Sequence, residues 1–237
     1  MNEVDEDGNS ALIWSVHHGR CDICQHLLSI KHVAVDLVNK LGHTALYDAA
    51  SFGWPAHVHA LAAHGADVNF SCEGLTALDA AAIHGHALAS PTSKPVVEAL
   101  LARGASMTLL AAACLGNLEE VQKFLERGVH PDEAKNGDGV SALWYAAERG
   151  YAPIVKAMLK RGACIDREDE DGRTPLFVAS RRGHLECVRV LVHAGANKNI
   201  IATGDHPSYK GKPIDVVCDS SDADQKNKDA IVDLLKD

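Results

Sequence analysis

Residues 172–188 read GRTPLFVASRRGHLECV, and this stretch decides the fold. Counted from Leu176, small residues follow at +3, +4 and +7, as Ala179, Ser180 and Gly183. Offsets of 0, +3 and +4 fall on one face of a helix, so the stretch predicts a short helix with a narrow buried side. The glycine ends this helix, and the apolar residues beyond it predict a second helix, antiparallel to the first.

The same unit occurs six times along the chain at nearly constant spacing. The leucines that mark the six copies are Leu12, Leu46, Leu78, Leu109, Leu143 and Leu176. Successive leucines are 34, 32, 31, 34 and 33 residues apart. Self-similarity at this period predicts a stack of helix hairpins, in which each hairpin buries its narrow face against the next.

Start and stop signals flank the helices in most copies. A serine or threonine stands two residues before the leucine and can cap the first helix; these residues are Ser10, Thr44, Thr76, Ser141 and Thr174. A glycine at +19 is expected to end the second helix; these residues are Gly65, Gly128, Gly162 and Gly195. Pro55, Pro95 and Pro153 fall in the first turn of second helices, where a helix tolerates proline.

These motifs resemble those of the ankyrin repeat family, whose period and Thr-Pro-Leu signature they share. The resemblance rests on residues 172–188, 42–46 (GHTAL) and 65–69 (GADVN), and it covers residues 5–200 and the remainder of the chain. It implies an all-α repeat solenoid, an ankyrin-type stack of antiparallel helix pairs with β-hairpin fingers. It also implies a concave groove formed by the fingers and the first helices. The family has no common catalytic residue.

The repeat pattern predicts a single domain over residues 1–237, with six repeats and a degenerate C-terminal cap. The expected divisions are 5–39, 40–70, 71–105, 106–134, 135–166, 167–199 and 200–237. Two repeats depart from the pattern. The third carries seven extra residues, which predicts a surface-loop insertion near residues 87–94, and the fourth has almost no finger before Leu109. The last unit contains a polar insert at 219–229, as expected of a terminal cap.

Charge and cysteine content restrict the function classes. The formal net charge is −9, so we expect no nucleic-acid partner and no attraction to an anionic membrane. The acidic first residues are not an export signal, and no segment is apolar enough for a membrane span. Seven scattered cysteines predict reduced thiols and a cytoplasmic or nuclear location.

Patterns that would indicate catalysis or metal binding are missing or lack the neighbouring residues that such a site requires. No nucleophile and base pair, phosphate loop or paired carboxylates occur where an active site would need them. Cys21 and Cys24, with nearby histidines, resemble half of a zinc site, but no second ligand pair follows. The acidic runs at 5–8 and 168–172 lack the spacing of a calcium loop and are expected at finger tips. We therefore expect no enzyme, no cofactor and no bound metal.

Offsets +2, +5 and +6 on each first helix lie opposite the buried face and are expected to project into the groove. The candidate partner-binding residues at these offsets are Trp14, His17, His18, Asp48, Ser51, Phe52, Ile83, His84, Leu115, Tyr145, Glu148, Arg149, Arg181 and Arg182. Exposed aromatic and apolar residues on one surface are typical of interaction hot spots. The hypothesis is a non-enzymatic interaction module, monomeric alone, that binds a protein or peptide segment. The apolar anchors of the partner segment would lie near Phe52, Ile83 and Leu115. The acidic residues of the partner would lie near Arg149, Arg181 and Arg182.

Two other function classes stay open. The chain is a metal or redox sensor if Cys114, the groove histidines or Cys21 and Cys24 bind metal or react with oxidants. It is a receptor or regulatory subunit if the activity belongs to a larger enzyme complex. The resemblance also implies that Asn69 and Asn199 occupy the finger position at which the family is often hydroxylated. His184 and His86, which follow turn glycines, are expected to order the turn.

Overall fold

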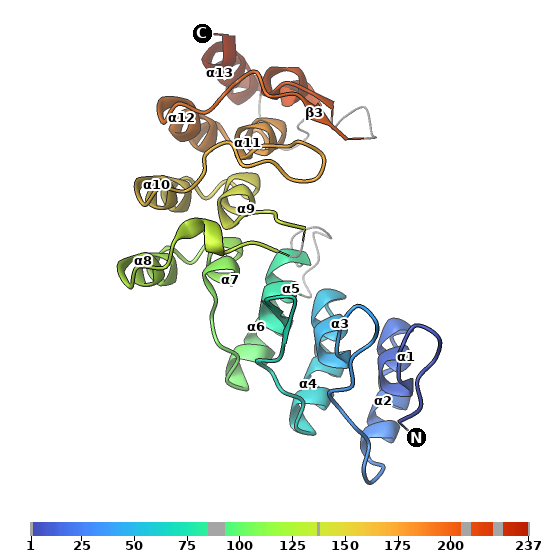
Figure 1. Ribbon diagram of the computed structural model, residues 1–237. Helices are drawn as coiled ribbons and strands as arrows, with labels where there is room; N and C mark the ends of the chain where they lie inside the picture. Colours follow the sequence, from blue (N-terminus) through green and yellow to red (C-terminus); the bar gives the residue numbers. More distant parts are fainter. Residues whose placement is uncertain (1, 85–92, 137, 205–209, 220–224, 237) are drawn as a thin grey trace. The chain divides into compact units, whose positions relative to one another are not determined.

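The computed structural model describes residues 2–84, 93–136, 138–204, 210–219 and 225–236. The chain divides into two compact units, Met1–Met107 and Thr108–Asp237, and each is described by itself (Figure 1). The single domain over 1–237 and the repeat divisions within it stay predictions. The insertion expected near 87–94 and His86 lie outside the described residues, apart from the end of the insertion, which belongs to a helix that begins at Ser93.

Unit 1 consists of three helix pairs and one short hairpin. Its elements are α1 (Ala11–His17), α2 (Cys21–Leu28), α3 (Ala45–Ser51), α4 (Pro55–Ala63), β1 (Ser71–Cys72), β2 (Leu75–Thr76), α5 (Ala77–His84) and α6 (Ser93–Ala102). The first helices α1, α3 and α5 pack side by side in one layer, and the second helices α2, α4 and α6 form the other (Figure 1). The predicted helix hairpins are therefore present.

Unit 2 repeats this arrangement and ends differently. Its helix pairs are α7 (Leu109–Cys114) with α8 (Leu118–Glu126), α9 (Ala142–Glu148) with α10 (Ala152–Lys160), and α11 (Pro175–Arg182) with α12 (Leu185–His193). The short 3₁₀ helix η1 (Pro131–Glu133) precedes α9. The terminal unit contains the hairpin of β3 (Ala202–Thr203) and β4 (Lys210–Gly211), then a 3₁₀ helix η3 (Pro213–Asp219) in place of a first α-helix, and α13 (Gln225–Lys236). This unit departs from the regular helix hairpins before it, and its role as a terminal cap stays a prediction.

The core is the narrow face predicted from the repeated leucine and small residues. Leu46, Leu78, Leu143 and Leu176 are each at most 1% exposed, and so are the alanines at +3 and +4 in the second and fifth copies. Small side chains at these positions let neighbouring hairpins approach closely. The cap residues act as predicted; for example, the Thr174 hydroxyl accepts a hydrogen bond from the Phe177 amide at 3.2 Å.

The sequence pattern offers no cap two residues before the leucine in the fourth copy, where Met107 stands. In the fourth copy the cap is Thr108, directly before Leu109, and its hydroxyl accepts from the Ala111 amide at 2.9 Å. Helix α7 is accordingly only six residues long. The described residues between Gly104 and Leu109 contain no strand or bridge, which agrees with the expected loss of a finger.

The turn glycines form contacts between successive repeats that the sequence did not reveal. At three turn glycines, Gly19, Gly116 and Gly150, the residue that follows the turn glycine of the next repeat covers the glycine. A β-carbon on Gly116 would lie 2.8 Å from Tyr151 Cζ, and one on Gly150 would lie 2.8 Å from His184 Nδ1. His184 Nε2 is also 2.9 Å from the Glu148 carbonyl oxygen, which confirms that His184 orders the turn.

In the described part of the chain, no helix is both long and apolar enough to cross a lipid bilayer.

Candidate partner-binding face

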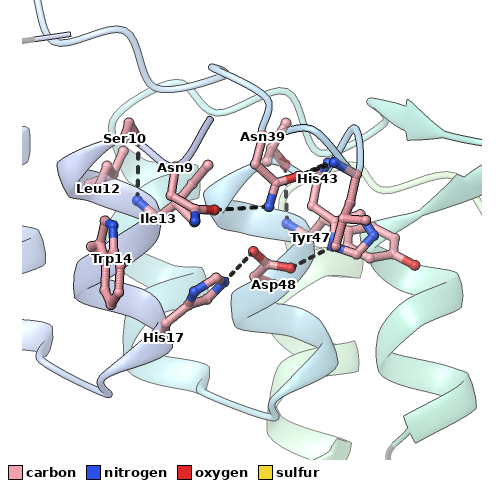
Figure 2. Close-up of polar contacts among 12 residues, drawn as sticks. Asn9, Ser10, Leu12, Ile13, Trp14, His17, Asn39, His43, Tyr47 and Asp48 are labelled. Atoms are coloured by element: carbon pink, nitrogen blue, oxygen red, sulfur yellow. Dashed lines mark hydrogen bonds and ion pairs between the residues drawn. The ribbon is translucent and has the colours of Figure 1, made fainter. Parts of the chain in front are cut away.

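A buried carboxylate joins the first two repeats of unit 1. Asp48 in α3 is 4% exposed, and its two oxygens face two histidine rings (Figure 2). His17 Nε2, from α1, lies 2.9 Å from Oδ2, and His43 Nδ1, from the finger before α3, lies 2.9 Å from Oδ1. A carboxylate only accepts hydrogen bonds, so each imidazole donates an N–H hydrogen bond to it. The three side chains, here called the carboxylate network, hold a finger and two helices together.

Two exposed aromatic rings lie beside this network. Trp14 and Phe52 are each 44% exposed, so two large apolar rings lie on the same surface. The Phe52 ring meets His17 edge-on, with ring centroids 5.7 Å apart, and the Trp14 ring stacks on His18 at 4.8 Å. The Trp14 indole N–H also donates to Asp5 Oδ2 at 2.6 Å. We call Trp14, His17, His18 and Phe52 the aromatic face; its rings are held in place before any partner arrives.

The fingers beside the aromatic face are shaped by side-chain amides and carboxylates. Asn39 Oδ1 accepts from the amides of Leu41 and His43, both at 3.0 Å. Asn39 Nδ2 donates to Asn9 Oδ1 of the preceding finger at 3.1 Å (Figure 2). Sequence analysis missed this role, although a signal exists. An Asp or Asn stands five residues before the helix cap in four fingers, as Asp5, Asn39, Asn136 and Asp169, and each accepts backbone amides of its finger.

The other candidates of unit 1 divide between surface and interior. His84 is exposed and Ser51 is half-buried, so both are available to a partner. Ile83 is only 9% exposed, and Asp48 is buried in the carboxylate network. The expectation that Ile83 and Asp48 project into the groove is therefore wrong: Ile83 belongs to the core and Asp48 positions His17.

In unit 2, two arginines of the predicted cationic surface, Arg149 and Arg182, form contacts within the protein. Arg149 is 8% exposed; its Nη1 donates to the Cys114 carbonyl of the preceding first helix, and its guanidinium lies 5.6 Å from the centre of the Tyr145 ring. Arg182 Nη2 forms a 2.6 Å ion pair with Glu148 Oε1. The expectation of exposure is wrong for Arg149 and for Tyr145, which is 7% exposed and whose pKa is raised by burial. Arg149 instead connects the end of α9 to α7, and the Tyr145 hydroxyl accepts a hydrogen bond from Asn136 Nδ2 of the preceding finger at 3.2 Å.

The remaining candidates of unit 2 are intermediate in exposure. Leu115, Glu148, Arg181 and Arg182 are half-buried, so their outer atoms can reach a partner. The charge of Arg182 is partly neutralised by Glu148, which weakens its attraction for an acidic partner residue.

Four of the described cysteines, Cys24, Cys72, Cys114 and Cys187, are buried in surroundings that suppress their reactivity. Burial raises the pKa of Cys187 to about 12, and it also raises the pKa of Cys24 and Cys72. Cys114 is 2% exposed. Since the thiolate is the reactive form, these thiols are poor nucleophiles near neutral pH. Among the described residues, no three or more His, Cys, Asp or Glu side chains are grouped to hold a metal ion.

The carboxylate network should stabilise unit 1 measurably. Replacing Asp48 with asparagine puts an NH₂ donor against one of two histidine donors. We therefore expect the free energy of unfolding of unit 1 to fall by about 2 kcal/mol. Amide hydrogen exchange of α1 and α3 measures this locally. The control is Asp22→Asn, which breaks an exposed ion pair with Arg20 and should leave that exchange unchanged. Equal exchange in wild type and Asp48→Asn would show that the network contributes no stability.

The stacked helix hairpins and the fingers between them define a repeat protein. Its first helices and fingers carry exposed residues that can contact a partner. The chain belongs to the ankyrin repeat family: the family model "Ankyrin repeats (3 copies)" matches residues 12–111 and 109–202. Domains of this family are in general protein–protein interaction modules, and the all-α repeat solenoid expected from the sequence is confirmed.

Two of the relatives that the chain matches are longer proteins. The chain is 38% identical to the E3 ubiquitin-protein ligase KEG of Arabidopsis thaliana over 46% of its length and 7% of the ligase. It is 30% identical to the B-cell lymphoma 3 protein homolog of Mus musculus over 83% of its length and 46% of that protein. It thus spans less than half of either relative. The solved human ASB11 ankyrin repeat domain is 24% identical and has a TM-score of 0.49, with 95% of this chain and 98% of that one covered.

Proposed function

We propose that the chain binds a partner protein through the first helices and fingers of unit 1, with the aromatic face as the anchor. The observation that carries this proposal is the pair of exposed rings, Trp14 and Phe52, on either side of His17. Exposed large apolar residues cost solvation free energy unless something covers them. Their burial against apolar side chains of a partner would recover that free energy.

The fixed geometry of the rings favours binding. Trp14 is held by His18 and Asp5, and Phe52 packs on a histidine that Asp48 orients. Side chains that are already ordered lose little conformational entropy on association. Tryptophan and other aromatic side chains at the centre of an interface also supply most of its free energy. The proposed partner segment therefore carries apolar side chains that pack on these two rings.

Unit 2 contributes a second proposed set of contacts. Leu115, Arg181 and Arg182 keep exposed atoms, so they suit an apolar side chain and carboxylates of the partner. The pairing of Arg182 with Glu148 makes us expect smaller effects here than at the aromatic face.

Location and assembly are also proposals. The six cysteines whose side chains the structure describes are free thiols, which favours the cytoplasm or nucleus. The net charge of −9 opposes self-association and binding to nucleic acid, so we propose a monomer with a protein partner.

The test is quantitative capture with matched baits. Native proteins held by the wild-type chain are compared with those held by a Trp14→Ala/Phe52→Ala variant and by an Ile23→Ala/Leu101→Ala control. Ile23 and Leu101 are 41% and 40% exposed but lie on second helices. We expect the first variant to bind the partner at least ~30-fold more weakly, which corresponds to the loss of a hot spot worth ~2 kcal/mol. The control should bind like wild type. A partner retained equally by all three baits would exclude the aromatic face.

A further inference from the structure

A groove with cationic rims lies between two second helices of unit 2. Helices α10 and α12 pack side by side in the layer away from the first helices (Figure 1). The groove between them is open to solvent and has a volume of about 580 Å³. It shares no residue with the face proposed to bind a partner in the preceding subsection.

The rims of the groove carry basic side chains in matching positions. Lys156 and Lys160 are four residues apart on α10, and Arg189 and His193 are four residues apart on α12. A spacing of four residues is about one helical turn, roughly 6 Å along the axis. Each rim therefore presents two basic groups on the same side of its helix, and all four residues are exposed.

The charge of the groove is opposite to that of the protein. Three formal cations and one acid, Glu186, line the groove, so its net charge is +2 with His193 neutral, whereas the chain carries −9. Glu186 faces Arg189, with Oε1 3.5 Å from Nε. Neither lysine has an ion-pair partner among the described residues, so both charges are available to a ligand.

The neighbouring second helix shows that this pattern is not a general property of the layer. On α8, Lys123 lies between Glu119 and Glu120, at 2.7 and 2.9 Å, and Glu126 adds a further negative charge. That helix is therefore acidic on its surface. The basic rims of α10 and α12 are therefore not shared by α8, which packs against α10.

The floor of the groove is apolar. Leu159, Val190 and Ala194 line it between the rims, and they are half-buried or exposed. An apolar floor between two basic rims matches a segment that carries one apolar side chain with carboxylates on both sides of it. Nucleic acid fits less well, because the basic residues form a short patch with an acid in it rather than a long stripe along a phosphate backbone.

We propose that this groove, the α10/α12 groove, binds an acidic segment of a partner protein, with Lys156, Lys160 and Arg189 pairing with carboxylates and Leu159 and Val190 receiving an apolar side chain. A second binding surface would let the chain hold two partners, or two segments of one partner, at the same time. Two linked contacts of modest affinity then act together with an increased effective concentration.

The test uses synthetic peptides and the whole chain. The probe has a central leucine with glutamates one helical turn away on both sides, and one control peptide has lysines in place of the glutamates. Binding is measured by fluorescence polarisation and mapped by NMR shifts of the backbone amides. We expect saturable binding of the acidic peptide only, shifts confined to α10 and α12, and weakening by added NaCl.

Variants connect the binding to the named side chains. The double variant Lys156→Glu/Lys160→Glu should bind the acidic peptide at least about tenfold more weakly, because two ion pairs are replaced by repulsions. The matched control is Lys123→Glu on α8, which should bind the peptide like wild type. Trp14→Ala/Phe52→Ala should also bind it like wild type, so failure of the proposed aromatic face and failure of this groove are distinguishable. Unchanged melting of each variant establishes that the fold is intact.

Three results would overturn the proposal. The first is the absence of saturable peptide binding at low salt. The second is equal binding by wild type and the Lys156→Glu/Lys160→Glu variant. The third is tighter binding of a single-stranded oligonucleotide, or of vesicles containing phosphatidylserine, than of the acidic peptide, which would assign the groove to another class of ligand.

Discussion

Replacing Phe177 with alanine is expected to destabilise unit 2 by about 3–5 kcal/mol. Phe177 is 1% exposed and lies in α11, which packs against α9, α12 and η3. Its removal leaves a cavity among three elements that cannot all close around it, so both transfer free energy and packing are lost. In a repeat stack the loss falls mainly on the hairpin concerned and its neighbours.

Trp144 provides the local measurement. Its indole N–H donates to the Arg173 carbonyl at 3.1 Å, so its fluorescence reports the contact between α9 and the segment before α11. In a Trp14→Phe/Trp54→Phe background it is the single tryptophan of the chain. Urea unfolding followed by Trp144 should then shift to lower urea when Phe177 is replaced.

The matched control is the same substitution at the surface. Phe52 is 44% exposed, so Phe52→Ala should cost less than about 1 kcal/mol, mainly the edge-on contact with His17. Hydrogen exchange of the flanking helices reports each site in its own unit. Comparable losses at the two positions would mean that the burial of Phe177 does not describe the native packing.

Replacing Gly116 with alanine is expected to cost about 3 kcal/mol, the second large effect. The residue has φ +74°, a left-handed conformation that costs a residue with a β-carbon about 1–2 kcal/mol. The new β-carbon would also lie 2.8 Å from Tyr151 Cζ, which forces the ring of the next repeat to move. Urea unfolding followed by Trp144 fluorescence measures the sum of the two effects.

A second glycine separates the two causes. Gly128 has φ +88°, and a β-carbon there would meet no atom within 4 Å, so Gly128→Ala should show the backbone cost alone. Adding Tyr151→Ala to Gly116→Ala removes the collision, and the pair should be less destabilising than the sum of the single changes. If Gly116→Ala costs no more than Gly128→Ala, the ring moves aside freely and the predicted contact between repeats has no energetic weight.

Much of the fold could be predicted because its determinants are local. The cap at Thr174, the small residues after Leu176 and the glycine at 183 act within one hairpin, and their effect depends on helix geometry alone. The period then shows that successive hairpins stack, since none can bury its narrow face alone. The 3₁₀ helix η3 could be predicted only as an irregular element, because residues 212–218 do not carry the leucine and small-residue spacing of the other first helices.

The candidate site could be predicted only in part. The offsets that place Trp14 and Phe52 on the surface hold, yet the equivalent offsets bury Tyr145 and Arg149. Exposure at these positions depends on the neighbouring repeat: Arg149 turns inward and its guanidinium donates a hydrogen bond to the Cys114 carbonyl of the preceding first helix.

The sequence by itself determined the repeat, the two helices of each hairpin, their caps and turns, and the identity of the core. These features follow from spacing within one repeat, where helix periodicity leaves few alternatives. Only the tertiary structure decided which surface residues are joined across repeats. His17 of the first repeat contacts Asp48 of the second, and Lys156 and Arg189, from successive repeats, line the same groove. Such contacts join residues of different elements, and their geometry depends on side-chain packing rather than on spacing.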